Sequence, residues 1–328
     1  MINAFVATVA LQQITLLDPD EWLPQFKQVG ATIVNVAHLK DGKLNASQTM
    51  GAPNDRVFQV GFLSRLPLIL ITFQLVESGK LDLKAPVSKY ITSFELPKSN
   101  LTENHPLLVE HLLTGQGGNK QYKYDGALSK SSASSRLDIL REFNFDYSPG
   151  TDTASSGPEI MVLQAVVEDI TGKSISELAQ ERVFKPLEIK NSSFGDPINQ
   201  QFVAPGEKFR FYYAQFSTQG MWSNASDLAK MYGAILTAFM GRKSIISQES
   251  AKMILSPVRD QKTYGLNRKE ENGMYSIFLG GQCSGYSANS RLLPESGTGA
   301  IIVTNGDMAW QPISSALDKL LENVNHNQ

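Results

Sequence analysis

The sequence contains very little cysteine, because Cys283 is the only one among 328 residues. A lone cysteine cannot form an intramolecular disulfide, and it excludes Cys-rich metal sites. Histidine is also scarce, and no two of the four have the spacing of metal ligands; they are His38, His105, His111 and His326. We therefore expect no metal and no cofactor, and we expect Cys283 to be a small buried side chain rather than a reactive thiol.

An excess of charge of either sign is also missing. The chain has 30 basic and 32 acidic residues and a net charge of −2. It contains no run of like charges that could neutralise phosphates or bind an anionic membrane surface. Nucleic acid is therefore not an expected partner. The composition, 41% hydrophobic and 19% charged, is typical of a folded globular protein rather than a disordered one.

Long hydrophobic runs are absent as well. The stretch from Leu66 to Val76 is far shorter than the roughly 20 residues that a membrane helix needs. Residues 1–17 are moderately apolar but have no basic region and no convincing cleavage site of a signal peptide. We expect these residues to be the first structural element of a soluble protein, and the missing signal favours a cytoplasmic location.

The hydrophobic pattern predicts strands at both ends of the chain and helices between them. Residues 31–51 resemble a hairpin that turns at Asp41-Gly42, and an apolar helix with Pro67 in its first turn should end before Gly79. Helical patterns dominate up to residue 254, including one after a cap at Ser226. Strand patterns then occupy 274–281, 288–294 and 299–305, before an amphipathic helix from Trp310. We predict an α/β sandwich from residues 1–57 and 255–328, interrupted by a helical region at 58–254.

Several segments carry a resemblance to a known family. FQVGFLSRLPLILITFQLVESGKLDLKAPVSKY (58–90) is followed in order by VEHLLTGQGG, SPGTDTASSG, GMWSNASDLAKMY and LGGQCSGYSANSRLLPESGTGAIIVTN. Together they make the chain similar to the serine β-lactamase and penicillin-binding-protein-like family, including class C-like esterases, over residues 29 to 320. The resemblance implies a β-lactamase/transpeptidase-like α/β fold, in which an antiparallel sheet is flanked by helices and a cleft separates it from a helical region.

The same resemblance implies that the family's reactive side chains are missing. Its nucleophilic Ser and the Lys three residues later fall on Phe62 and Arg65, and a guanidinium stays protonated in proteins. The Tyr and Asn of its Y-S-N motif fall on Ser155 and Gly157, and the His of its H-x-G motif falls on Leu279. A conventional serine β-lactamase, peptidase or esterase is therefore not expected.

Backbone amides could survive these changes. By the resemblance, an oxyanion hole would use the amides of Phe62 and of Gln282, which follows Gly281, and two such amides can polarise a carbonyl without a covalent step. We therefore expect Phe62, Arg65, Ser155, Gly281 and Gln282 to bind an acyl- or carbonyl-bearing small molecule, with a non-covalent reaction of the cyclase or isomerase type. Two alternatives stay open: an inactive pseudoenzyme that serves as a binding or scaffold module, and a serine hydrolase with a relocated nucleophile.

Each singled-out residue also has a structural interpretation. Ser64 lies two positions after Phe62 and should face away from the cleft. Arg65 should form an ion pair with a nearby carboxylate, or else bind an anionic or carbonyl-bearing ligand. Phe62 either fills vacated space or forms an aromatic wall. Ser155 is not expected to be a nucleophile, because the matched motifs offer no His or Lys to activate it.

Overall fold

A computed structural model describes residues 15–325, apart from 54, 123, 207–210 and 272–273. Residues 1–14, in which we expected the first structural element to begin, lie outside the described residues. The first helix that the structure describes is α1 (Pro19–Lys27), and the side chain of Asp18 caps it by accepting a hydrogen bond from the amide of Asp20.

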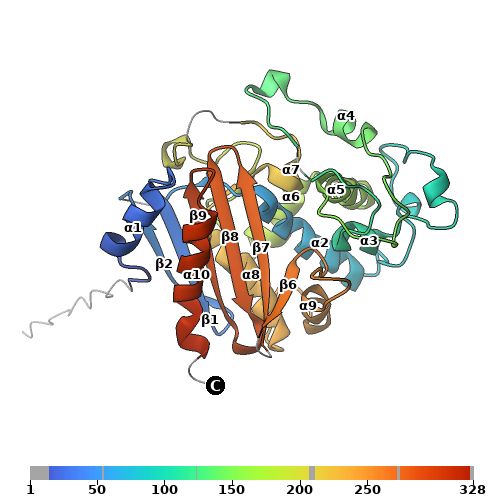
Figure 1. The fold of residues 1–328 in the computed structure, drawn as a ribbon. Helices are drawn as coiled ribbons and strands as arrows, with labels where there is room; N and C mark the ends of the chain where they lie inside the picture. Colours follow the sequence, from blue (N-terminus) through green and yellow to red (C-terminus); the bar gives the residue numbers. More distant parts are fainter. Residues whose placement is uncertain (1–14, 54, 123, 207–210, 272–273, 326–328) are drawn as a thin grey trace, which may run out of the picture.

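A six-stranded antiparallel sheet forms the centre of the molecule (Figure 1). Its strands are β1 (Val34–Lys40), β2 (Lys43–Met50), β6 (Asn267–Glu271), β7 (Met274–Cys283), β8 (Tyr286–Leu293) and β9 (Thr298–Asn305), in the order β2-β1-β9-β8-β7-β6. The predicted hairpin turn is confirmed, because Asp41 and Gly42 both have positive φ angles, of 52° and 72°. Since β1 pairs with β9, the two ends of the chain meet within one sheet.

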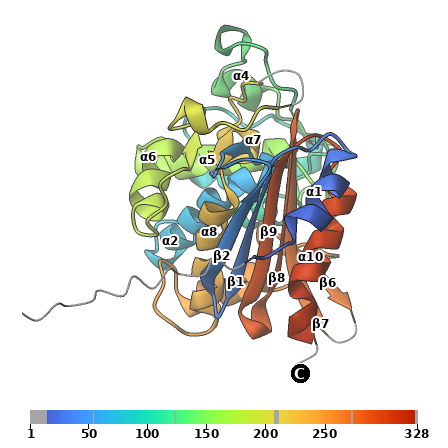
Figure 2. The same ribbon diagram turned by 90° about the vertical axis from the view of Figure 1, so that its left-hand side faces the viewer.

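Helices cover both faces of this sheet (Figure 2). Helices α1 and α10 (Trp310–Asn325) lie on one face, where Trp22, Phe26 and Ile313 share an apolar cluster with strand residues. Helix α8 (Ala225–Phe239) packs on the other face. Its cap is Asn224 and not Ser226 as predicted, because the Asn224 side chain is the one that reaches the amide of Asp227, at 2.9 Å.

The remaining helices and a small sheet form the region beside α8. The helices are α2 (Leu66–Glu77), α3 (Val109–Thr114), α4 (Arg136–Arg141), α5 (Gly157–Thr171), α6 (Ile175–Ala179), α7 (Phe216–Gln219) and α9 (Gln248–Leu255), and the small sheet joins β3 (Phe58–Gln59), β5 (Met221–Ser223) and β4 (Ser193–Phe194). Helix α2 has Pro67 in its first turn and Gly79 beyond its end, as predicted. Helix α2 and the first three turns of α5 are buried on nearly all sides, which explains their largely apolar sequences.

The predicted fold class is thus confirmed: an antiparallel sheet flanked by helices and joined to a helical region. The division into residues 1–57 with 255–328 and residues 58–254 stays a prediction, and α8 from the middle segment packs directly on the sheet. Within the described part of the chain, no helix combines the length and apolar character needed to cross a membrane.

Candidate active site

The short 3-10 turn Gly61–Arg65, which precedes α2, lies against strand β7. A Cβ atom on Gly281 would come within 2.2 Å of the Val60 carbonyl oxygen and 2.9 Å of the Phe62 amide nitrogen, so only glycine allows this approach. The structure therefore brings the Phe62 backbone next to Gly281 and Gln282. Ser64 is structural, as predicted, because it is fully buried and its Oγ accepts a hydrogen bond from the amide of Met221 at 3.1 Å.

Arg65 lies against aromatic side chains, and the carboxyl group of Glu159 acts on it electrostatically without an ion pair. Its guanidinium carbon is 5.0 Å from the centre of the Phe62 ring, and that ring meets Tyr122 edge-on at 4.9 Å. Arg65 forms no ion pair with any residue that the structure describes, so the expected ion pair is not found there; its buried Nε also has no hydrogen-bond partner. Burial lowers the pKa of Arg65 to about 10, which leaves the side chain cationic at neutral pH.

The hydroxyl of Ser155 lies next to a lysine. The Nζ of Lys262 is 2.7 Å from the Ser155 Oγ, and Ser155 is exposed while Lys262 is partly buried. Burial lowers the pKa of Lys262 the most, and the positive charge of Arg65 lowers it further. The matched motifs offered no lysine beside Ser155, but the structure places one there from outside these motifs. Lys262 lies 107 residues further along the chain and outside the matched motifs, so only the fold brings the two side chains together.

Ser155 is held at the start of helix α5. The next residue, Ser156, caps this helix: its Oγ accepts a hydrogen bond from the amide of Glu159 at 3.3 Å and donates one to Asn119 at 3.0 Å. On the other side, the amide of Ala154 donates to the Gly115 carbonyl at 2.7 Å. The positive end of the helix dipole therefore lies beside the Ser155 hydroxyl, where it favours a developing negative charge.

Lys262 is held by a tight turn before β6. Its amide donates to the Arg259 carbonyl at 2.8 Å, and its Nζ also contacts the Asn267 side chain at 3.2 Å. Three residues later, the amide of Gly265 donates to the Leu113 carbonyl at 2.8 Å. Gly265 has a φ of +95°, and a Cβ there would lie 2.4 Å from Ile69, so the glycine lets the turn dock against α2 and α3.

A buried carboxyl group completes the cluster. Glu159 is 1% exposed; its Oε1 accepts a hydrogen bond from the amide of Asn119 at 3.1 Å, and its Oε2 has no partner. Burial raises the pKa of Glu159 to about 8. Arg65, Ser155, Glu159 and Lys262 line one cavity of about 20 Å³, which has room for roughly one water molecule.

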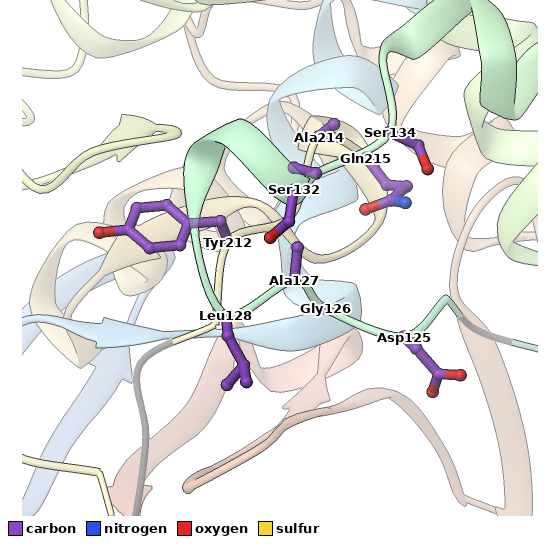
Figure 3. A pocket seen from close by; sticks show the side chains of 10 residues that line it. Asp125, Gly126, Ala127, Leu128, Ser132, Ser134, Tyr212, Ala214 and Gln215 are labelled. Carbon is purple, nitrogen blue, oxygen red and sulfur yellow. The ribbon is translucent and has the colours of Figure 1, made fainter.

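A larger pocket of about 360 Å³ lies elsewhere, between residues 125–134 and 212–215 (Figure 3). Its lining includes Leu128, Tyr212 and Gln215, and none of the site residues predicted from the sequence. We therefore place the candidate active site at the smaller cavity, where the ionisable and nucleophilic groups gather.

Sequence reasoning missed Lys262 and Glu159. Glu159 left a signal, because it is a lone charge at the start of the apolar stretch of α5, and a carboxyl there must be buried or partnered. Lys262 left none, because its partner is distant in sequence. Gly157 and Leu279, which occupy the family's Asn and His positions, are buried and offer no reactive side chain.

The family model named Beta-lactamase matches residues 23–312, and the chain belongs to the beta-lactamase family. A protein of Escherichia coli O157:H7 named "Putative D-alanyl-D-alanine carboxypeptidase" is 22% identical, over 94% of this chain and 79% of its own length. The teichoic acid D-alanine hydrolase of Staphylococcus aureus is 25% identical, over 68% of this chain and 54% of its own. The fold also matches the D-amino acid amidase of Ochrobactrum anthropi, with a TM-score of 0.74 and 16% identity over 94% of this chain and 99% of the amidase.

These relatives correct our functional expectation. We expected a non-covalent cyclase or isomerase, or an inactive pseudoenzyme, but the similar proteins carry the names of hydrolases. The expectation depended on the family's reactive positions at Phe62 and Arg65, and it overlooked a serine and lysine that meet only in three dimensions.

Proposed function

We propose that the chain is a serine-type acyl hydrolase in which Ser155 is the nucleophile and Lys262 the general base. The observation that carries this proposal is the 2.7 Å contact between the Lys262 Nζ and the exposed Ser155 Oγ. A serine hydroxyl is a weak nucleophile unless a base takes its proton. An amine can do so only when neutral, and the burial that lowers the pKa of Lys262 enlarges the neutral fraction.

In the first half of the reaction, Lys262 accepts the Ser155 proton while the Oγ attacks the substrate carbonyl. The charge that develops on the carbonyl oxygen needs donors. Arg65 lines the same cavity, has a buried Nε without a partner, and stays cationic, so we assign it to this charge. The amides of Phe62 and Gln282 remain our predicted additional donors.

In the second half, the tetrahedral intermediate collapses and expels the leaving group, which takes the proton from Lys262. The product of this step is an ester between the substrate acyl group and Ser155. Water then attacks that ester, Lys262 accepts the proton of the water, and Ser155 recovers it as the acid product leaves. The dyad therefore needs no further side chain to close the cycle.

For the substrate we propose an ester or amide of a D-amino acid. Support comes from the names of the relatives, a D-alanyl-D-alanine carboxypeptidase, a teichoic acid D-alanine hydrolase and a D-amino acid amidase, which share a D-amino acid acyl group. The exposed position of Ser155 is consistent with access by such a small acyl group.

The test is hydrolysis of D-alanine p-nitroanilide and of the corresponding D-alanyl ester, each compared with its L isomer. We expect turnover of the D isomers by the wild type and its loss in Ser155→Ala and Lys262→Met. Ser131→Ala, at an exposed serine in the short 3-10 helix Lys130–Ser132, serves as the matched control and should keep full activity. Turnover that persists in Ser155→Ala would refute the assignment of the nucleophile.

A further inference from the structure

Two loops that are far apart in the sequence are joined next to the Ser155–Lys262 pair. The loop 150–155 carries Ser155, and the turn 258–262 carries Lys262. The side chain of Arg259 donates to the Gly150 carbonyl at 3.0 Å, and the Thr153 Oγ1 donates to an oxygen of the Asp260 carboxylate at 2.8 Å. Three side-chain contacts therefore join the loop 150–155 to the turn 258–262, and the contact between Lys262 and Ser155 is one of them.

Asp260 has an unusual backbone. Its φ is +51°, a left-handed conformation that costs a residue other than glycine free energy, although aspartate tolerates it better than most. The conformation places Asp260 at the tip of the tight turn, two residues before Lys262 and facing Thr153. A strained residue persists where surrounding contacts hold it, and here the hydrogen bond from Thr153 supplies such a contact.

We infer that Thr153 and Asp260 are positioning residues, whose hydrogen bond holds the Lys262 turn against the nucleophile loop and so sets the contact between the Nζ and Oγ atoms. This inference rests on the proposed function for its catalytic consequence. Neither side chain lines the cavity shared by Ser155 and Lys262, so both act through the position of the lysine.

The charges around Lys262 fix the direction of the expected change. Burial and the cation of Arg65 lower the pKa of Lys262, whereas Glu159 and Asp260 raise it, and burial is the largest of these influences. When the hydrogen bond between Thr153 and Asp260 is lost, the turn that carries Lys262 can move toward water. Lys262 is then less buried, so the largest of the influences on its pKa weakens. The pKa of Lys262 should then rise, and the neutral fraction of the amine should fall.

Thr153→Val tests this inference with the least disturbance, because it removes the hydroxyl but keeps the shape of the side chain and the charge of Asp260. Thr153→Ser keeps a hydroxyl and should behave as the wild type. The pKa of Lys262 is followed by NMR titration of protein with labelled lysine, and the signal is assigned by its absence in Lys262→Arg. We expect Thr153→Val to raise this pKa and to lower kcat by roughly tenfold with KM nearly unchanged, because misplaced catalytic groups slow the chemical step.

A second variant changes Asp260, which accepts the hydrogen bond from Thr153. Asp260→Gly removes the acceptor and suits the left-handed backbone, and it should also lower kcat; Glu188→Gly is its control, since Glu188 is exposed and has a similar φ of 52°. An unchanged Lys262 pKa together with an unchanged kcat in Thr153→Val would overturn the inference. If Ser155→Ala keeps its activity, the proposed function fails, but the NMR titration still decides whether Thr153 positions the lysine.

Discussion

Glu159 offers the most direct link between the structure and a measurable free energy. Its carboxyl group is buried, and its pKa is raised from an ordinary 4.5 to about 8. The folded state therefore binds the proton more tightly than the unfolded state does. This contribution to stability is complete below pH 4.5 and is lost as the pH rises toward 8.

Glu159→Gln removes the titration but keeps an oxygen that can accept the amide hydrogen bond of Asn119. Each pH unit between the two pKa values is worth about 1.4 kcal/mol, so the three units from pH 5 to pH 8 amount to about 4 kcal/mol. The free energy of unfolding of the variant minus that of the wild type should therefore increase by about 4 kcal/mol between pH 5 and pH 8. The comparison uses urea unfolding of both proteins at pH 5 and pH 8, with extrapolation to water.

The control is Glu103→Gln, which makes the same substitution at an exposed position in a separate loop. A difference between Glu159→Gln and the wild type that is equal at both pH values would refute our reasoning about the buried carboxyl group. Above about pH 8, where Glu159 is ionised, the variant should also raise kcat/KM relative to the wild type, because removing this negative charge lowers the pKa of Lys262 and enlarges its neutral fraction.

Three further predictions follow from single contacts. Lys262→Met should reduce kcat by at least about 100-fold, as loss of a general base does, measured with a D-alanyl ester; a loss below tenfold would contradict its role. Gly265→Ala should destabilise the protein by roughly 2 kcal/mol or more, because alanine suits neither the φ of +95° nor the contact with Ile69; an unchanged melting temperature would contradict this. Asn224→Ala should cost about 1 kcal/mol of unfolding free energy through loss of the α8 cap, whereas Ser226→Ala should cost much less.

Local sequence patterns predicted most of the fold. The hairpin at Asp41-Gly42 and the buried helix before Gly79 were readable because turn geometry, periodicity and caps depend on neighbours in the sequence. The cap of α8 was misplaced by two residues, because Asn224 and Ser226 are both good cap residues and only the backbone decides between them.

The active site was predicted only in part. Arg65 and Ser155 were predicted as site residues and do line one cavity, but the lysine beside Ser155 was not foreseen. A motif reports groups that are close in the sequence, whereas the lysine that contacts Ser155 belongs to a distant turn, which the hydrogen bond of Gly265 to Leu113 docks in place. The position of Glu159 at the start of an apolar helix indicates a buried or partnered carboxyl group, but its raised pKa depends on packing around the whole helix and could not be predicted.

The central claim is that Ser155 is an activated nucleophile, and covalent labelling tests it most directly. Wild-type protein and Ser155→Ala are incubated with a fluorophosphonate, and intact mass and peptide mapping locate the adduct. We predict one adduct on the wild type, located on Ser155, and none on the variant. A wild type that stays unmodified, or an adduct on another serine that survives in Ser155→Ala, would contradict the claim.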